Sequence, residues 1–398
     1  MIFKRSNIEQ QVPDLPHEVK WCSKCVVSNQ KPRVVFDNEG ICSGCNNTYY
    51  KNHVIDWEKR ENELLALLDE HRRSDGYWDV IVPSSGGKDS GFVAHQLRYK
   101  YGMNPLTVTW SPLKYTDIGL YNLQAHIDSG LSNLLCTPNG NLQRKLARLS
   151  FEELGDAFHV FVLGQVCYPL HIALKLGVKL VFYGENGEVE YAGDPKGADK
   201  PLSPVEDMQK RNFKGVAFRD LLEFGLEHKD YLSRDDFCES DLIFYEPPHF
   251  KKLKQAGILG RHFFSYYRKW TPQENYYYCV ENTGFKPSPI RSEGTYSKYA
   301  SIDDKMDGFH YYMRYIKFGL GRCVEDAGHE IRDGHLTREE GVALMRRYEG
   351  EFPERYFKEF LEYLDITEKH FWVVVNSLRL PHLWEKDNCE WKLKHPIS

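Results

Sequence analysis

The chain has 398 residues and a formal net charge of −5, with Lys and Arg interspersed among Asp and Glu. This length allows a large core with one or two accessory modules, and the lack of a basic block argues against binding along a nucleic-acid backbone. No uninterrupted apolar run approaches about 18 residues, and the first residues lack the apolar segment of a signal peptide. We therefore expect a cytoplasmic protein that binds neither nucleic acid nor membrane.

Two C-x-x-C pairs follow residues 1–20, a polar segment that we expect to be a flexible arm. Cys22 and Cys25 are separated by sixteen residues from Cys42 and Cys45. This doubled spacing is typical of a four-thiolate zinc ribbon, whereas a redox motif needs only one pair. Because four thiolates leave no open coordination position, residues 21–55 are predicted to hold a structural Zn²⁺.

The six other cysteines stand in apolar or aromatic surroundings, which predicts ordinary buried thiols. They are Cys136, Cys167, Cys238, Cys279, Cys323 and Cys389.

Residues 56–76 are predicted to form a linking helix, with Asp56 as its cap and Trp57, Leu64, Leu65 and Leu68 on one stripe. A β-branched strand from residue 79 to 83 follows and ends abruptly in a Ser/Gly turn. A helical pattern then starts at once.

This strand-to-helix turn has the properties of a phosphate-binding loop. Gly86 and Gly87 let the backbone approach an anion closely, and Ser85 and Ser90 add hydroxyl groups. The positive end of the following helix points to the same place. A Walker A motif would need Gly at position 82 and Ser or Thr at position 89, where this chain has Val and Asp. Residues 85–90 instead resemble the SGGxDS loop of the ATP pyrophosphatase (PP-loop) superfamily.

Strands predicted near residues 106–110, 133–136 and 178–183 alternate with helices, which favours a parallel sheet with ligands at the carboxyl ends of its strands. The resulting PP-loop core is expected over residues 77–300. Gly184, Glu185, Asn186 and Glu190 leave the fourth strand at that edge. Their carboxylates suit Mg²⁺, although an acidic loop exposed to solvent explains the same charges.

The remainder of the chain gives weaker signals. Residues 194–260 show no clear sheet pattern, and the aromatic residues 263–270 suit either a core or a base-binding surface. From residue 302 the chain is predicted to be helical to its end, as a C-terminal region over residues 301–398. Lys317, Arg322 and Arg332 in this region suit either a phosphate or carboxylate clamp or salt bridges on a helical surface.

An ordered set of motifs resembles the N-acetyl sugar amidotransferases typified by WbpG and PseA of bacterial surface-glycan pathways. The set spans roughly residues 22 to 355 and comprises the two cysteine pairs, 36–40, 55–57, the 85–90 loop, 183–186, 190–191, 294–297, 303–305, 317–322, 330–332 and 337–340. The resemblance implies conversion of an acetamido group on a nucleotide-activated sugar to an acetamidino group, in lipopolysaccharide O-antigen or nonulosonic acid biosynthesis. ATP would adenylate the amide oxygen, and ammonia would then displace AMP.

The resemblance also implies the roles of individual residues. It places ATP on Ser85, Gly86, Gly87, Ser90, Trp110 and Gly184. It assigns phosphate neutralisation, Mg²⁺ and catalysis to Lys88, Asp89, Glu185, Asn186 and Glu190. It assigns binding of the acidic groups of the sugar nucleotide to Lys317, Arg322 and Arg332.

No glutaminase domain is recognisable, so ammonia is expected from a separate glutaminase subunit, which in some members acts with a cyclase-like subunit. One alternative is a tRNA-thiolating PP-loop enzyme. The acidic net charge, the missing basic face and the lack of a catalytic cysteine pair in the core argue against it. Another is a zinc-ribbon interaction module on a degenerate core, which would have no need for an intact loop.

Overall fold

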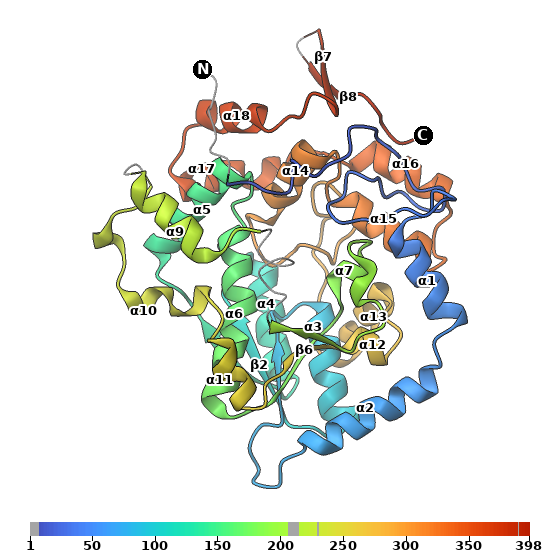
Figure 1. The fold of residues 1–398 in the computed structure, drawn as a ribbon, viewed down its shortest axis with the longest axis vertical. Coiled ribbons are helices and arrows are strands. Elements are labelled where there is room, and N and C mark those ends of the chain that lie inside the picture. Colours follow the sequence, from blue (N-terminus) through green and yellow to red (C-terminus); the bar gives the residue numbers. More distant parts are fainter. Residues whose placement is uncertain (1–7, 206–214, 229–230, 389) are drawn as a thin grey trace.

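The structure is a computed structural model that describes residues 8–205, 215–228, 231–388 and 390–398 (Figure 1). Residues 1–7 of the expected arm, and Cys389, lie outside the described residues. A six-stranded sheet with the order β3-β2-β1-β4-β6-β5 forms the centre. Its strands are β1 (Val80–Pro83), β2 (Pro105–Trp110), β3 (Ser132–Cys136), β4 (Leu180–Tyr183), β5 (Leu202–Pro204) and β6 (Gly260–Phe263). Only the β5–β6 pair is antiparallel, so the predicted parallel α/β core is confirmed.

Helices cover both faces of the central strands, which explains why β1 and β4 are apolar throughout. They are α2 (Trp57–His71), α3 (Lys88–His95) with a π-helical extension (Gln96–Lys100), α4 (Asp117–Asp128), α5 (Gly140–Leu154) and α6 (His159–Leu176). Ile81 and Val181 pack into a core with α5 and α6. Val80 and Val82 pack into the opposite core with α2 and α3, because successive strand residues point to opposite faces.

Helix α6 is apolar enough, by length and composition alone, to cross a membrane. However, 61% of it is buried inside the protein, where it packs on β1, β2 and β4. This is the environment of a core helix in an α/β protein.

The linking helix is confirmed as α2, and the Asp56 side chain accepts a hydrogen bond from the Lys59 N–H. Leu64 and Leu68 are fully buried, as the stripe predicts. Leu65 does not belong to this stripe, because its side chain is 42% exposed.

The segment from 184 to 300 contains two strands that its pattern did not predict. Strand β6 pairs with β4 inside the sheet, and β5 forms the sheet edge beyond it. These strands are only three and four residues long, too short for a periodic signal. The aromatic segment that begins at Phe263 is core, since Phe264, Tyr267 and Trp270 are buried. The helices here are α7 (Gly187–Glu190), α9 (Phe218–Glu227), α10 (Glu239–Leu242), α11 (Phe250–Gln255), α12 (Phe264–Tyr267) and α13 (Pro272–Asn282).

The C-terminal region is helical, as predicted, but it does not stay helical to its end. Its helices are α14 (Asp307–Phe318), α15 (Cys323–Arg332), α16 (Arg338–Tyr348), α17 (Phe357–Leu364) and α18 (Glu368–Ser377). An antiparallel hairpin of β7 (Trp384–Asp387) and β8 (Glu390–Leu393) follows them and projects from the body at the top of Figure 1.

The two ends of the chain share one core. The cysteine-rich segment leads into helix α1 (Ser43–His53), and its Cys22, Val26 and Val27 pack with Val324 and Ala327 of α15. Figure 1 shows α1 beside α15 and α16. Residues near the start are also tied to the C-terminal region, because Glu9 accepts a hydrogen bond from Lys317 at 2.9 Å.

The prediction that all six unpaired cysteines are buried is wrong for Cys238. This residue is exposed, and its Sγ lies 3.3 Å from an Asp241 carboxylate oxygen. Cys136 is partly exposed, whereas Cys167, Cys279 and Cys323 are buried as expected.

Lys317 is placed for a structural role rather than for the substrate clamp that the sequence suggested. Its side chain is only 4% exposed, and its Nζ donates to both Glu9 and the Leu154 carbonyl. We expect Lys317→Ala to lower the free energy of unfolding by about 3–5 kcal/mol, since it leaves a buried carboxylate without its partner. Chemical denaturation measures this, and Lys358→Ala, at a site 89% exposed, serves as control. A variant of unchanged stability with a raised KM for substrate would contradict this placement.

Candidate active site

The phosphate-binding loop lies where the strand order reverses. The chain runs from β1 outward to β2 and β3, and then returns to place β4 on the other side of β1. In open α/β sheets, ligands bind at this reversal, outside the carboxyl ends of the strands. Residues 84–88 follow β1 and residues 184–190 follow β4, so the sheet brings the two predicted segments together.

Ser84 organises the loop from within, a role that the sequence did not reveal. Its Oγ accepts from the Gly86 N–H at 3.2 Å and donates to Ser90 Oγ at 3.0 Å. Its carbonyl accepts from Thr109 Oγ1 at 2.6 Å, and its Oγ also lies 3.2 Å from His126 Nε2. Burial lowers the pKa of His126 to about 4, so the ring is neutral at neutral pH. Ser90 Oγ in turn donates to the Gly87 carbonyl, which places this hydroxyl inside the loop.

Gly86 is required by both its conformation and its neighbours. Its φ of +82° lies in the left-handed region. A Cβ here would lie 2.6 Å from the Leu123 Cα of α4. Only glycine lets the loop pack this closely on α4.

A cavity opens beside the loop and encloses about 760 Å³, including the part open to solvent; we name it the loop cavity. It is lined by Pro83, Ser84, Ser85, Gly87, Asp89, Ser90, Val108, Trp110, Gln165, Tyr183, Gly184 and Glu185. The structure thus brings most of the residues predicted to bind ATP to one place. Trp110 forms a fixed wall, because a Cβ at Gly164 of α6 would lie 2.0 Å from its indole ring.

Lys88 and Asp89 start helix α3, and each borders a different cavity. Asp89 lines the loop cavity, and its carboxylate pairs with Lys88 and accepts from Asn275 Nδ2 at 3.2 Å. Lys88 is buried and lines a neighbouring cavity, where its Nζ lies 5.8 Å from the Tyr299 ring centre.

Glu185 shares the loop cavity with Asp89. Burial, and then the Asp89 charge, raise the pKa of Glu185 to about 7, while Lys88 opposes this rise. Two carboxylates that repel one another beside a phosphate-binding loop are oxygen donors of the kind that Mg²⁺ prefers. The donor set therefore fits a divalent cation on Asp89 and Glu185.

The structure does not bring the other two predicted acidic-loop residues into the loop cavity. The Asn186 side chain accepts from the Glu188 N–H and caps helix α7. Glu190 is buried in an ion pair with Lys51 at 2.8 Å, and Lys51 also donates to the Trp270 carbonyl. Because this carboxylate already has a cationic partner, its placement favours a structural role.

Asp303 brings the C-terminal part of the chain to the loop. Burial, and then the Asp307 charge, raise the pKa of Asp303 to about 6, and the nearby Ser85 side chain opposes part of this rise. The adjacent Asp304 carboxylate accepts from the backbone N–H groups of Leu113 and Met306. The motif at 303–305 had been noticed in the sequence, but a separation of more than two hundred residues hid its contact with the loop.

The two predicted arginines occupy different surroundings. Arg322 donates to Tyr311 at 2.6 Å, pairs with Asp326 at 2.9 Å, and borders the same cavity as Lys88. Arg332 donates to the Glu190 carbonyl at 3.0 Å. The thiolates of the cysteine cluster help to raise the pKa of Arg332 against the effect of its burial, so this arginine faces the cluster rather than the loop cavity.

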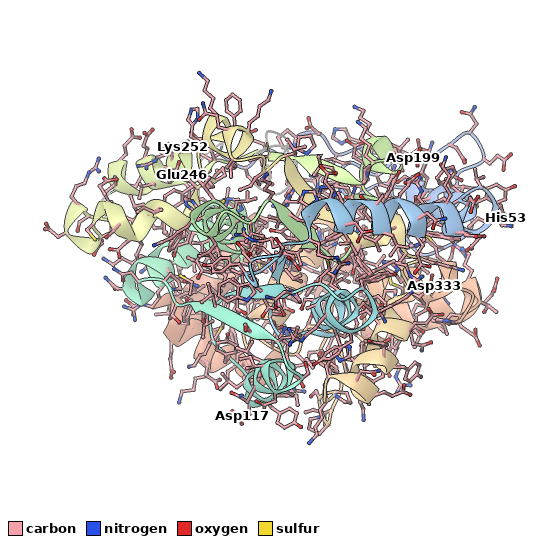
Figure 2. The ribbon with its side chains drawn as sticks, turned by 90° about the horizontal axis from the view of Figure 1, so that it is seen from below. His53, Asp117, Asp199, Glu246, Lys252 and Asp333 are labelled. Atoms are coloured by element: carbon pink, nitrogen blue, oxygen red, sulfur yellow. The ribbon has the colours of Figure 1, made fainter. Side chains whose placement is uncertain are left out.

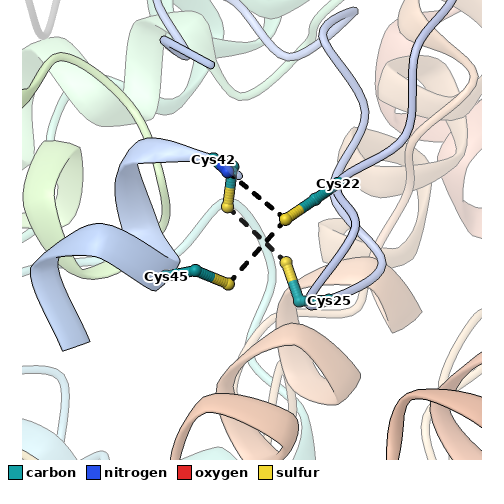
Figure 3. Close-up of side chains that lie close together, drawn as sticks. All are labelled: Cys22, Cys25, Cys42 and Cys45. Carbon is teal, nitrogen blue, oxygen red and sulfur yellow. Dashed lines mark hydrogen bonds between the residues drawn. The ribbon is translucent and has the colours of Figure 1, made fainter. Parts of the chain in front are cut away.

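The four cysteines of the two pairs converge, as Figure 3 shows. Their sulfur atoms all lie within 4.8 Å of one another, with Cys22–Cys45 at 3.9 Å and Cys25–Cys42 at 3.6 Å. A tetrahedral Zn–S site with bonds of about 2.3 Å requires sulfur separations of about 3.8 Å. The N–H groups of Lys24 and Cys42 point to Cys22 Sγ, as expected around a thiolate. The cluster therefore fits a four-coordinate metal.

The metal-binding segment is fixed to the loop that follows β4. Arg33 forms an ion pair with Glu188, and Ser43 Oγ donates to the Gly193 carbonyl at 2.9 Å. The Lys51–Glu190 pair is a third link. The metal centre thus supports the segment that carries Glu185 without itself reaching the loop cavity.

We expect the purified protein to contain about one Zn²⁺ per chain, since the cluster supplies four thiolates. Cys42→Ser removes one ligand and should lower the melting temperature while ATP binding by the core persists. Elemental analysis and thermal denaturation measure both effects, with Cys238→Ser as an exposed control. Metal-free protein of unchanged stability would show that the cluster binds no structural metal.

Glu185→Gln should increase stability at alkaline pH. The pKa of Glu185 rises from 4.5 in the unfolded chain to about 7 in the folded protein. Between these two pH values, the folded state therefore holds a proton that the unfolded chain has released. Its contribution to stability therefore falls as the pH rises through this window. The amide removes this loss, so we expect a higher melting temperature than wild type at pH 8, no difference at pH 4, and weaker Mg²⁺-dependent ATP binding. A wild-type advantage at pH 8 would contradict the raised pKa.

Comparison with known proteins supports the family resemblance for part of the chain. Residues 293–397 match the family model described as LPS biosynthesis protein WbpG-like, C-terminal domain. These residues include Asp303 and Arg322, so the matched region borders the loop. The resemblance to WbpG-like proteins is confirmed over this region.

Two further matches are limited. A stretch of 88 residues is 28% identical to the uncharacterised protein MJ1599 of Methanocaldococcus jannaschii, and covers 22% of this chain and 31% of that protein. The chain thus matches only about a third of that relative's length. The U34-tRNA thiolase NcsA from Methanococcus maripaludis with its [4Fe-4S] cluster is 13% identical, with coverage of 79% of this chain and 86% of that one. Its TM-score of 0.28 is too low to support an argument.

Proposed function

Because residues 293–397 match the WbpG-like family model, we propose that this chain is an ATP-dependent N-acetyl sugar amidotransferase of surface-glycan biosynthesis. It converts an acetamido group on a nucleotide-linked sugar to an acetamidino group, with AMP and pyrophosphate as the other products. The proposal includes a cytoplasmic location and ammonia from a separate glutaminase subunit, in some cases together with a cyclase-like one.

The chemistry requires an activated amide, because an amide carbonyl has a poor leaving group. Attack of the amide oxygen on the α-phosphorus of ATP breaks the bond to the β-phosphate and releases pyrophosphate. Ammonia then adds to the imidate carbon, loses protons, and expels AMP, which leaves the amidine. The protein's task is to align the two substrates and to stabilise phosphate charge.

The residues at the loop suit these tasks. The backbone N–H groups of Gly87 and Lys88 at the start of α3 suit phosphate oxygens, and Lys88 neutralises their charge. A divalent cation on Asp89 and Glu185 would supply further charge for the triphosphate. No side chain acts as a covalent nucleophile, and none is needed.

The observation that carries the proposal is the cavity that Lys88 of the loop shares with Tyr299, Arg322 and His329 of the matched region. It joins the region that matches the WbpG-like model to a loop with the features of an ATP pyrophosphatase, so both regions border one site. The tRNA-thiolating alternative gains no comparable support, because no described residue at the loop cavity is a cysteine.

The proposal is tested with purified protein, ATP, Mg²⁺, a high ammonium concentration and a panel of UDP- and CMP-linked acetamido sugars. We expect AMP, pyrophosphate and an amidine product, seen by mass spectrometry as replacement of O by NH. Glutamine should not replace ammonium until the glutaminase is added. Lys88→Ala and Asp89→Ala should fold normally and lose activity by about 10²-fold or more, as when one electrostatic stabiliser is removed.

ADP and phosphate as products would contradict the PP-loop chemistry. Glutamine turnover by this chain alone would contradict the separate ammonia source. Sulfur transfer to tRNA would contradict the proposed function as a whole.

A further inference from the structure

A second cavity lies on the other side of Lys88 from the loop cavity; we name it the side cavity. It encloses about 410 Å³, including the part open to solvent, and Lys88, Tyr191, Tyr299 and His329 are among its lining residues. Asp89 borders the loop cavity, and its neighbour Lys88 borders the side cavity. A ligand in the side cavity therefore adjoins the phosphate-binding loop. Attack on the α-phosphorus needs the second substrate next to the bound ATP, and the side cavity meets this requirement.

His329 marks the side cavity as a binding site. The residue is only 6% exposed, yet its Nε2 has no hydrogen-bond partner among the described residues. A buried polar atom without a partner costs free energy. Its ring is held edge-on to Tyr191, with centroids 4.6 Å apart, which fixes its orientation. The nitrogen has almost no accessible surface, so a ligand hydroxyl or amide N–H would satisfy it once the neighbouring side chains move aside.

The other walls favour a polyol over an anion, because the cations Lys88 and Arg322 that line the cavity are already paired with Asp89 and Asp326. Glu330 accepts from the Tyr299 hydroxyl at 3.4 Å, which leaves its second oxygen available as an acceptor. Asp333, labelled in Figure 2, also lines the cavity. Carboxylates repel phosphate but accept hydrogen bonds from sugar hydroxyls, and the tyrosine rings suit the apolar face of a sugar.

Arg322 connects the side cavity to a third one, the distal cavity, since it lines both. The distal cavity also carries Lys305 and Arg355. The three cations Arg322, Lys305 and Arg355 suit the phosphate groups of a nucleotide carrier.

We propose that the side cavity binds the acetamido sugar of the second substrate, with His329 and Glu330 as hydrogen-bond acceptors, and that Arg322 and the distal cavity bind its nucleotide. This assignment rests on the proposed function and names the half-sites of its acceptor. It predicts that sugar and nucleotide recognition can be weakened separately.

The test measures binding to the full chain by calorimetry. The probes are UDP-N-acetylglucosamine and CMP-N-acetylneuraminate, with UDP and CMP as their sugar-free counterparts. We expect wild type to bind at least one sugar nucleotide more tightly than its nucleotide alone. His329→Leu and Glu330→Gln should each weaken the sugar nucleotide about tenfold, the effect of one lost hydrogen bond, and leave the nucleotide unchanged. Arg355→Ala should weaken both ligands, and His228→Leu, at an exposed site just after α9, should change neither.

The outcomes separate the inference from the function that it rests on. Unchanged sugar-nucleotide affinity in folded His329→Leu and Glu330→Gln would overturn the side-cavity assignment, while AMP formation on acetamido sugars would leave the proposed function intact. If these variants instead raised only the KM for ammonium, the cavity would serve the nucleophile and the assignment would fail. Absence of any sugar-nucleotide binding by wild type, with normal ATP binding, would overturn both.

Discussion

The reversal of strand order between β1 and β4 is the constraint on which the site depends. It leaves a gap at the carboxyl edge of the sheet that no crossover covers. The loop after β1 and the loop after β4 both enter this gap, so backbone donors and carboxylates meet without any contact in sequence. Ser84, whose Oγ lies 3.2 Å from His126 Nε2 of α4, and Gly86, which packs closely on Leu123, then hold the first loop against α4.

The charged side chains at this gap interact with one another, and their balance determines the electrostatics of the site. Asp89 and Glu185 repel one another, and the cation Lys88 lies beside them. The repulsion between the two carboxylates is unfavourable, and a metal-bound triphosphate would relieve it.

The N- and C-terminal parts of the chain act as a frame around this centre. The cysteine cluster packs on α15 and is tied to the β4 loop through the Lys51–Glu190 pair. The same helix α15 carries His329 into the side cavity. The cysteine cluster thereby supports both the acidic loop and the wall of the second cavity, although it reaches neither.

The sequence by itself determined the elements whose signals are local. The parallel core, the 85–90 loop and the four-cysteine cluster were predicted because strand–turn–helix patterns and cysteine spacing act over short distances. It also placed Lys317 and Glu190 among functional residues, since charge alone does not reveal a partner. Only the tertiary structure decided that these two are buried in ion pairs and that Asp303 reaches the loop. The physical reason is that a side chain's role depends on neighbours brought together by packing, across separations that no local pattern records.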